Sequence, residues 1–183
     1  MNCALYFGSF NPLHAGHIAI AKYVLQNCDV DSLRFVLTPE NPFKSGSGTL
    51  ENEKSRLERL QDAIKRFNDE YGGRPAEVST VEFELPRPNY TYNTLEHLRR
   101  SEPQTRFSII MGADNIANIE RWYKWREILS EYQILVYPRR GFDSRALCKK
   151  YNATFLDAPL YDISSTMIRE MAARGENTDN LTF

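Results

Sequence analysis

Short apolar runs alternate with longer segments of helical periodicity along nearly the whole of this 183-residue chain. The runs have the length and composition of buried strands, whereas the segments between them have the apolar spacing of helices. Strands are expected at Cys3–Phe7, Leu33–Leu37, Phe107–Met111 and Ile134–Tyr137, with a further alternating strand at Val78–Leu85. Helices are expected at His14–Gln26, Glu51–Asn68, Tyr92–Arg100, Trp122–Ser130, Ser144–Lys150 and Ser165–Arg174. Because strands that alternate with helices form covered parallel sheets, the sequence predicts an α/β fold in one domain, residues 1–183.

Charge and composition argue against several classes of partner. Lys and Arg total 23 and Asp and Glu total 24, so the net charge of −1 gives no general attraction to nucleic acid or anionic membranes. No apolar run approaches the roughly 20 residues of a membrane helix, and no signal-like leader is evident, so we expect a soluble, cytoplasmic protein. Cys3, Cys28 and Cys148 form no CxxC pair, which argues against a disulfide framework or a zinc site. Whether the chain forms a homo-oligomer is left open.

The segment GSFNPLHAGH, from Gly8 to His17, follows the first expected strand and opens the first expected helix. Ligands of open parallel sheets bind at this end of the strands. Gly8 lets the backbone approach a nucleotide closely, and the helix N-terminus offers free N–H groups to an anion. His14 and His17 are three residues apart, so both rings are expected on one helix face, and Gly16 between them carries no side chain to block a phosphate. We therefore expect two imidazole donors to bind one polyphosphate.

Two other interpretations of this segment are weaker. In the first, Gly8 and Pro12 merely shape a turn, but a strand, a glycine turn, paired histidines and a helix in this order are hard to assemble by accident. In the second, His14 and His17 bind a metal, but zinc wants a third protein ligand and helical zinc pairs usually stand four residues apart. The GxGxxG and GxxxxGK[ST] motifs are absent, which disfavours a dehydrogenase or a P-loop kinase.

The same segment resembles the HxGH signature of the nucleotidyltransferase superfamily, and in particular the GSFNPxHxGH opening of bacterial nicotinate-nucleotide adenylyltransferases. Other segments resemble motifs of that family in the family's order, which supports a Rossmann-like open parallel sheet with helices on both faces. They are Asn41–Lys44 in the lid, Tyr90–Leu95 on the pyridine side, Gly112–Asp114 with Trp122 in the centre, and Ile163–Arg169 as the closing ISSTxIR motif. Phe43 is a departure, because it stands where the family's lid usually has a histidine.

The resemblance implies transfer of AMP from ATP to nicotinate mononucleotide, which gives deamido-NAD and pyrophosphate. The attacking 5'-phosphate is already an anion, so no general base or activated Ser or Cys is needed. Magnesium is expected to arrive with ATP, because no dedicated carboxylate cluster is evident. The partners are then ATP and a pyridine mononucleotide. Nicotinamide mononucleotide or phosphopantetheine as acceptor, a cytidylyltransferase, and a nucleotide-sensing regulator without turnover remain alternatives.

The resemblance also assigns site residues. Catalysis is expected to involve His14, His17, Lys44 and Arg169. The expected ATP site comprises Gly8, Ser9, Phe10, His14, His17, Gly112, Asp114, Ile163, Ser164, Ser165, Thr166 and Arg169. The expected mononucleotide site comprises Asn11, Lys44, Thr91, Thr94, Trp122 and Tyr123. In this scheme His17 stabilises the α-phosphoryl group in transfer, Lys44 closes over the phosphates, and Arg169 clamps the departing phosphates.

Local interpretations compete with these roles on the ATP side. Ser164, Ser165 and Thr166 are also typical of a plain helix N-cap. Asp114 is expected to accept hydrogen bonds from a ribose diol, as acidic residues do in dinucleotide folds, or else to cap the next helix.

The same competition exists on the pyridine side. Trp122 and Trp125 are spaced to share a helix face, which favours two core positions by periodicity alone. The resemblance instead places the Trp122 indole against the pyridine ring. Thr91 and Thr94 lie in a segment that the resemblance places against the nicotinate carboxylate, near the backbone N–H of Tyr123. The alternative is a capping arrangement of Thr91 or Asn93 with Glu96.

Overall fold

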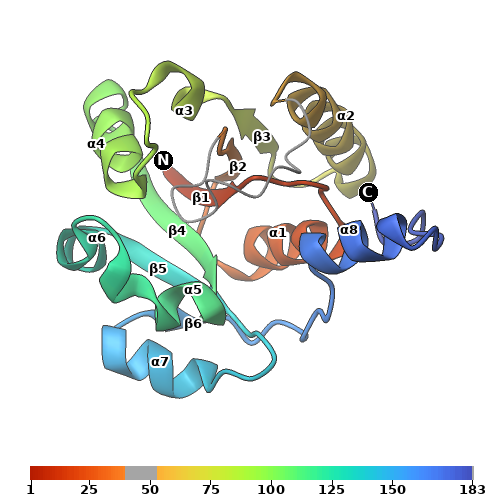
Figure 1. Ribbon diagram of the computed structural model, residues 1–183. Coiled ribbons are helices and arrows are strands. Elements are labelled where there is room, and N and C mark those ends of the chain that lie inside the picture. The colour runs from red at the N-terminus through yellow and green to blue at the C-terminus, as the bar shows by residue number, and fades with distance from the viewer. Residues whose placement is uncertain (40–52, 183) are drawn as a thin grey trace.

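A computed structural model of the chain describes residues 1–39 and 53–182 (Figure 1). Within these residues the strands are β1 (Asn2–Gly8), β2 (Ser32–Leu37), β3 (Ala76–Ser79), β4 (Arg106–Gly112), β5 (Gln133–Tyr137) and β6 (Thr154–Phe155). They form one sheet in the order β3-β2-β1-β4-β5-β6, and all neighbouring strands run parallel. This is the strand order of the doubly wound Rossmann fold, so the expected fold class is confirmed.

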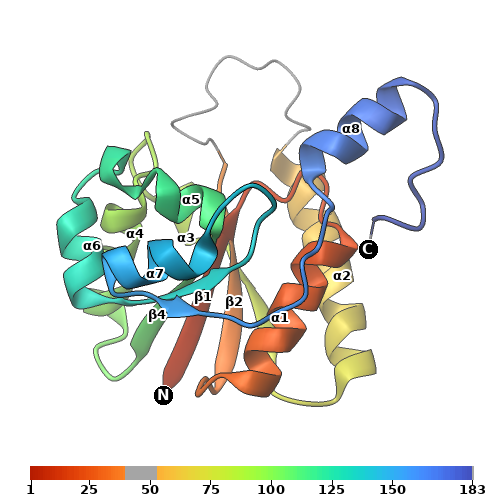
Figure 2. The same ribbon diagram turned by 90° about the horizontal axis from the view of Figure 1, so that it is seen from below.

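Helices cover both faces of the sheet, as Figures 1 and 2 show. They are α1 (Ala15–Asn27), α2 (Glu53–Tyr71), α3 (Val81–Glu84), α4 (Thr91–Ser101), α5 (Ala113–Ala117), the 3-10 helix η1 (Ile119–Arg121), α6 (Trp125–Glu131), α7 (Ser144–Tyr151) and α8 (Ser165–Ala173). One face of the sheet packs against α1 and α2, and the other against α4 to α7. Helix α8 lies beyond the carboxyl ends of the strands, near the start of α1 (Figure 2).

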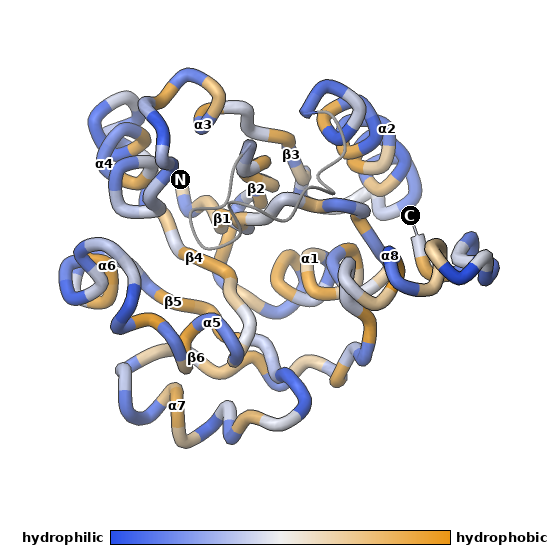
Figure 3. Tube along the Cα trace, in the orientation of Figure 1, coloured by the Kyte–Doolittle hydropathy of each residue, from blue (hydrophilic) through white to orange (hydrophobic). Residues whose placement is uncertain are grey.

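The sheet divides the hydrophobic core into two clusters. Alternate residues of β1 serve each cluster: Ala4 and Tyr6 pack with α1 and α2, whereas Cys3 and Leu5 pack with the helices on the opposite face. Burial on both faces explains why the strands are continuous apolar runs rather than alternating ones. The hydropathy colouring in Figure 3 shows the apolar residues concentrated on the strands and on the helix sides that face them.

Two sequence-based expectations about elements are wrong. Val78–Leu85 is not one strand, because β3 ends at Ser79 and the one-turn helix α3 begins at Val81, too short to display a 3.6-residue period. The helix expected from Trp122 begins only at Trp125, because Lys124 has the left-handed φ of 53° that interrupts a helix. Trp122 and Trp125 therefore do not share a helix face.

Two exclusions drawn from composition bear on the described structure. Cys3, Cys28 and Cys148 are free thiols; Cys3 and Cys148 are buried and Cys28 is partly buried. Of the helices in residues 1–39 and 53–182, none has the length and apolar character needed to cross a membrane.

Candidate active site

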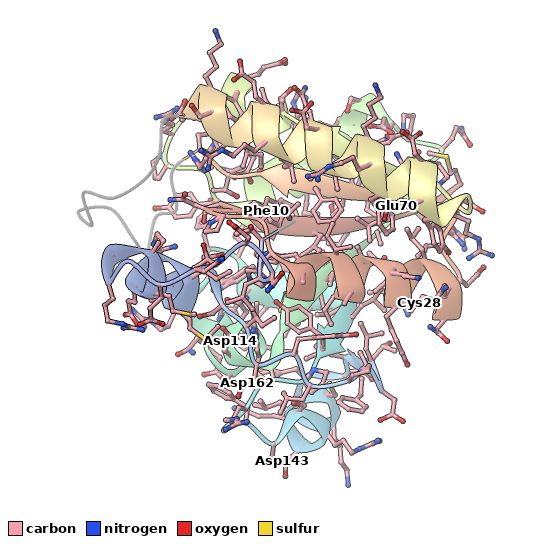
Figure 4. All side chains as sticks on the ribbon, turned by 90° about the vertical axis from the view of Figure 1, so that its right-hand side faces the viewer. Phe10, Cys28, Glu70, Asp114, Asp143 and Asp162 are labelled. Carbon is pink, nitrogen blue, oxygen red and sulfur yellow. The ribbon has the colours of Figure 1, made fainter. Side chains whose placement is uncertain are left out.

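Two cavities open at the carboxyl ends of β1 and β4, where the strand order of the sheet reverses. The larger, about 550 Å³, is bordered by the turn after β1, the start of α1, the loop after β5 and the start of α8. The smaller, about 120 Å³, lies between that turn and the segments around α3, α4 and η1. Gly8, Ser9 and Asn115 border both cavities, so the two meet at the turn. In Figure 4, Phe10, Asp114 and Asp162 lie toward this end of the molecule, and Cys28 and Glu70 lie at the other.

His14 and His17 stack against each other at the edge of the larger cavity. Their ring centroids are 3.7 Å apart with an interplanar angle of 27°. His14 is the extended N-cap residue of α1 rather than its first helical residue, and its backbone N–H donates to His17 Nδ1 at 3.3 Å. Because Nδ1 of His17 accepts a hydrogen bond, the ring proton of its neutral form resides on Nε2. His17 is thus set to donate through Nε2.

Both imidazoles are neutral at physiological pH. Burial, and to a smaller extent the positive charge of Arg139, lowers the pKa of His14 to about 4. Burial is also the main cause that holds the pKa of His17 well below its ordinary value, followed by His14 and Arg139. The described residues around the larger cavity therefore offer two uncharged imidazole donors beside the guanidinium cations of Arg139 and Arg140.

The glycines near the cleft make room for side chains of the site. A Cβ at Gly8 would stand 2.9 Å from the Phe10 ring, and a Cβ at Gly16 would stand 3.1 Å from the His14 ring. A Cβ at Gly112 would collide with the Asp114 carboxylate. Gly8 and Gly16 were expected to admit the ligand's phosphates directly. In the structure the space that they leave belongs to Phe10 and His14.

Phe10 packs against His17 at the border of the larger cavity. It has a φ of 42°, an uncommon backbone conformation for a bulky residue, and its side chain is only 4% exposed. Its ring packs edge-on against His17 at 5.2 Å and against Phe35 at 5.3 Å between centroids. The adjacent Asn11 is also buried. Phe10 therefore borders the larger cavity, whereas the buried Asn11 does not border it.

The start of α8 brings polar side chains to the same cavity. Ser164 is the N-cap, and its hydroxyl accepts from the backbone N–H of Met167 at 3.1 Å, so the capping interpretation is confirmed for this residue. The Ser165 hydroxyl donates to the Pro12 carbonyl at 3.0 Å. Ile163 to Met167 line the cavity, which leaves the first N–H groups of α8 directed toward it.

Arg169 ties α8 to the turn after β1. Its Nη1 donates to the Asn11 carbonyl at 2.6 Å, and its Nη2 donates to the Thr166 hydroxyl at 3.1 Å. The guanidinium thus joins the opening and closing motifs of the sequence. Arg169 does not itself border the larger cavity.

Arg139 belongs to the site although it lies outside the motifs of the sequence. It follows β5, lines the larger cavity, and pairs with Asp114 at 3.6 Å. It also donates to the Ile163 carbonyl and the Tyr137 hydroxyl, both at 3.3 Å. The rule that ligands bind at the carboxyl ends of parallel strands would have found it, because β5 ends two residues before. Asp114 lies in the first turn of α5 and its side chain forms no cap hydrogen bond, so the capping alternative is wrong.

The smaller cavity holds most of the residues expected on the pyridine side. Thr91, Trp122 and Tyr123 line it, and the Tyr123 ring lies 5.1 Å from the Tyr90 ring. The N-cap of α4 is Tyr90, whose side chain forms no cap hydrogen bond, so the capping arrangement of Thr91 with Glu96 is not present.

Thr94 does not border the smaller cavity. It is fully buried and its hydroxyl donates to the Glu82 carboxylate at 2.8 Å. Glu82 and Asn89 do line the cavity, although neither belongs to a motif that was singled out above.

The remaining expectations concern the lid residues and metal binding. Lys44 and Phe43 lie outside the described residues. Within the described part of the chain, no group of three or more His, Cys, Asp or Glu side chains is placed to hold a metal ion. The donors around the larger cavity are imidazoles, hydroxyls and the guanidiniums of Arg139 and Arg140, with Asp114 and Asp162 as carboxylates, a set suited mainly to phosphate oxygens.

Similarities to known proteins cover nearly the whole chain. The family described as cytidylyltransferase-like matches residues 5–171. A Bacteroides fragilis protein named "Probable nicotinate-nucleotide adenylyltransferase" is 41% identical over 174 residues, which cover 94% of this chain and 83% of that protein. A Flavobacterium psychrophilum protein of the same name is 38% identical over 183 residues, covering 99% and 91%. The structure of Plasmodium falciparum nicotinic acid mononucleotide adenylyltransferase complexed with NaAD has the same fold, with a TM-score of 0.80 at 17% identity over 98% of this chain and 87% of that one.

Proposed function

The chain belongs to the nicotinate-nucleotide adenylyltransferase family within the cytidylyltransferase-like proteins, and from that membership we propose that it transfers AMP from ATP to nicotinate mononucleotide. The products are deamido-NAD and pyrophosphate. The observation that carries the proposal is that the cavity beside His14 and His17 meets the cavity beside Trp122 at the Gly8–Ser9 turn. Two substrates that occupy the two cavities would bring their reacting ends together at this turn.

The reaction is an in-line displacement at phosphorus. A 5'-phosphate oxygen of the mononucleotide forms a bond to the α-phosphorus of ATP, and the bond from that phosphorus to the α,β-bridging oxygen breaks. Pyrophosphate leaves with the electron pair. Since the nucleophile is an anion, the protein's task is to align two anions and to stabilise charge in the transition state.

We assign phosphate binding to the groups around the larger cavity. His17 donates through Nε2 to the α-phosphoryl group, and His14 binds a neighbouring phosphate oxygen. The N–H groups at the start of α8 and the Arg139 guanidinium attract the β- and γ-phosphates. Arg169 supports these groups through its bond to the Asn11 carbonyl. Lys44 is included on the family resemblance alone.

We assign the mononucleotide base to the smaller cavity. Trp122 stacks on the pyridine ring, which is flat and positively charged in a mononucleotide. Thr91 and the Tyr123 backbone bind the carboxylate of the ring. Asp114 accepts from a ribose hydroxyl of the adenosine.

Magnesium enters with ATP in this proposal. Carried on the phosphates, the ion would supply positive charge that stabilises the departing pyrophosphate. The residues around the larger cavity fit that role because they offer donors to phosphate oxygens, and the metal needs only phosphate and water ligands. A cytoplasmic location belongs to the same proposal, because the donor nucleotide is available there.

A pyrophosphate-release assay tests the proposal. The purified chain, ATP and magnesium are combined with nicotinate mononucleotide, nicotinamide mononucleotide or 4'-phosphopantetheine. We expect release with nicotinate mononucleotide at the highest kcat/KM. Nucleotide binding without release from any acceptor would favour a non-catalytic regulator, and release only with 4'-phosphopantetheine would move the chain to another branch of the superfamily.

A further inference from the structure

The smaller cavity contains a buried carboxyl group that adenylyl transfer does not require. Glu82, in α3, is 1% exposed and lines this cavity. Its Oε1 accepts a hydrogen bond from the Thr94 hydroxyl at 2.8 Å. Oε2 is buried and accepts no hydrogen bond of ordinary length and angle from the described residues, although the Thr38 hydroxyl also lies near this carboxyl. A buried acceptor without a donor is costly, so a ligand that brings a donor, or a proton on the carboxyl itself, would relieve it.

Asn89 adds a second unsatisfied acceptor to the same wall. Its amide nitrogen donates to the Glu82 backbone carbonyl at 2.9 Å, and its Oδ1 is buried without a partner among the described residues. Asn89, Glu82 and Thr91 all line the cavity that Trp122 borders. The substituent of a pyridine ring stacked on Trp122 would therefore meet acceptor oxygens and one carboxyl group.

The surroundings of Glu82 control its charge. Burial raises the pKa of its carboxyl to about 7, and the smaller opposing effects come from the hydroxyls of Thr94 and Thr38. These hydroxyls come from α4 and from the segment after β2, and no charged group among the described residues contributes to the shift. Among the described residues, the other titratable groups that line the cavity are the phenols of Tyr90 and Tyr123. Near neutral pH, Glu82 is therefore present in both protonation states.

We propose that Glu82 is a specificity-determining residue that distinguishes a carboxylate from a carboxamide on the pyridine ring through its own protonation state. The inference rests on the proposed function, because it assigns the pyridine mononucleotide to this cavity. Protonated Glu82 donates its O–H to the nicotinate carboxylate. Ionised Glu82 repels that carboxylate and accepts an N–H from the carboxamide of nicotinamide mononucleotide. The preference for the acid substrate then weakens as pH rises.

The ratio of kcat/KM for nicotinate mononucleotide to kcat/KM for nicotinamide mononucleotide isolates this effect. Both substrates carry the same 5'-phosphate and react with the same ATP, so titration of these groups cancels in the ratio. Because kcat/KM reports ionisations of the free enzyme, the ratio is expected to be level below pH 6.5 and to fall above pH 7.5 by up to about tenfold per pH unit.

The experiment measures pyrophosphate release from both mononucleotides between pH 6 and pH 9. Glu82→Gln keeps an acceptor for Thr94 and a permanent N–H donor, so its ratio should stay level within about threefold. Glu84→Gln is the matched control, because Glu84 is exposed on the same helix, and its ratio should fall as in the wild type. Thr94→Val removes the hydroxyl that stabilises the ionised carboxyl, so it should move the onset of the fall to higher pH.

Every result of this experiment either supports or overturns the inference. A wild-type ratio that does not change with pH overturns the inference, as does a Glu82→Gln variant that keeps the wild-type slope. A purely structural role for Glu82 would lower both values of kcat/KM together and leave the ratio and its pH dependence intact. If Glu82→Gln does not fold, as circular dichroism would show, the wild-type slope and the shift in Thr94→Val remain decisive. Absence of pyrophosphate release with either substrate at every pH would contradict the proposed function itself.

Discussion

His14 and His17 offer uncharged imidazoles to the cleft before any nucleotide binds. Burial, together with Arg139, holds the pKa of each ring below its ordinary value. The hydrogen bond from the His14 backbone to His17 Nδ1 fixes the direction in which the second ring donates. Such a donor is aligned in advance, so it stabilises charge in the transition state without reorganising. A bound triphosphate would raise both pKa values and strengthen the interaction.

His17→Ala should reduce kcat by about 100- to 1,000-fold, the usual cost of removing one aligned donor to a transition-state oxyanion. Steady-state pyrophosphate release measures the effect. His97→Ala is the control, because His97 is exposed on α4, away from both cavities. If the His17 and His97 variants turn over at the wild-type rate, His17 has no part in the transfer.

Trp122→Ala should weaken nicotinate mononucleotide binding by about tenfold and leave the affinity for ATP nearly unchanged, since only the pyridine ring loses its stacking partner. Isothermal titration with each nucleotide separates the two affinities. Trp125→Ala is the matched control, because Trp125 is a partly buried indole that does not border the smaller cavity. Equal effects of the two substitutions would count against stacking on Trp122.

At the scale of elements, α8 joins helix capping to phosphate binding. Ser164→Ala removes the hydrogen bond to Met167, which should lower the free energy of unfolding by about 1 kcal/mol. It should also raise the KM for ATP several-fold, because the first turn of α8 borders the larger cavity.

Asp143→Ala separates these two effects. Asp143 is the N-cap of α7, where its carboxylate accepts from the Ala146 backbone at 3.0 Å, and it does not border either cavity. Its loss should lower stability by a similar amount, measured by urea unfolding, without changing the KM for ATP. A KM for ATP that rises equally in both variants would show that helix fraying alone is responsible.

The periodicity of the sequence predicts the long elements well and the short ones badly. Strands β1, β2, β4 and β5 are continuous apolar runs buried on both faces, so their positions follow from composition. Helices α3 and α5 and strand β6 span five residues or fewer, too few for a period to emerge. Their positions depend on tertiary contacts instead.

The residues of the site also differ in how well the sequence predicts them. Residues inside motifs, such as His14, His17 and Ser164, reach the larger cavity because the turn after β1 and the start of α8 come together there. Arg139 and Glu82 lie outside the motifs of the sequence, and only Arg139 has a local signal, its position two residues after the end of β5. Arg139 lies at the site because β5, which precedes it, pairs with β4. Glu82 lies there because α3 packs near α4, where the Glu82 carboxylate accepts a hydrogen bond from Thr94. Such proximity arises from the packing of distant segments, which one sequence does not display.

At the scale of the whole molecule, two buried groups make stability depend on pH in opposite directions. The pKa of His14 is lowered to about 4 by folding, so its contribution is present above pH 6.5 and is lost as pH falls toward 4. The pKa of Glu82 is raised to about 7, so its contribution is present below pH 4.5 and is lost as pH rises toward 7. Between these limits the two changes oppose each other.

His14→Asn should reveal how much His14 contributes to the pH dependence of the free energy of unfolding. Relative to the wild type, the variant should gain about 3 kcal/mol in free energy of unfolding when pH falls from 7 to 4, because only the His17 imidazole then remains to be protonated in a buried position. Urea unfolding at both pH values measures the change. His97→Asn should behave as the wild type does. A stability difference between His14→Asn and the wild type that is the same at both pH values would contradict the account of His14.

If the two substrates meet at the Gly8–Ser9 turn as proposed, the bond that breaks in ATP joins the α-phosphorus to the α,β-bridging oxygen. The most direct measurement follows ATP labelled at the α-phosphorus, and separately at the γ-phosphorus, during reaction with nicotinate mononucleotide. The α label should appear in the dinucleotide and the γ label in pyrophosphate. Recovery of the γ label in a pyridine nucleotide, or of the α label only in free AMP or ADP, would contradict adenylyl transfer by this protein.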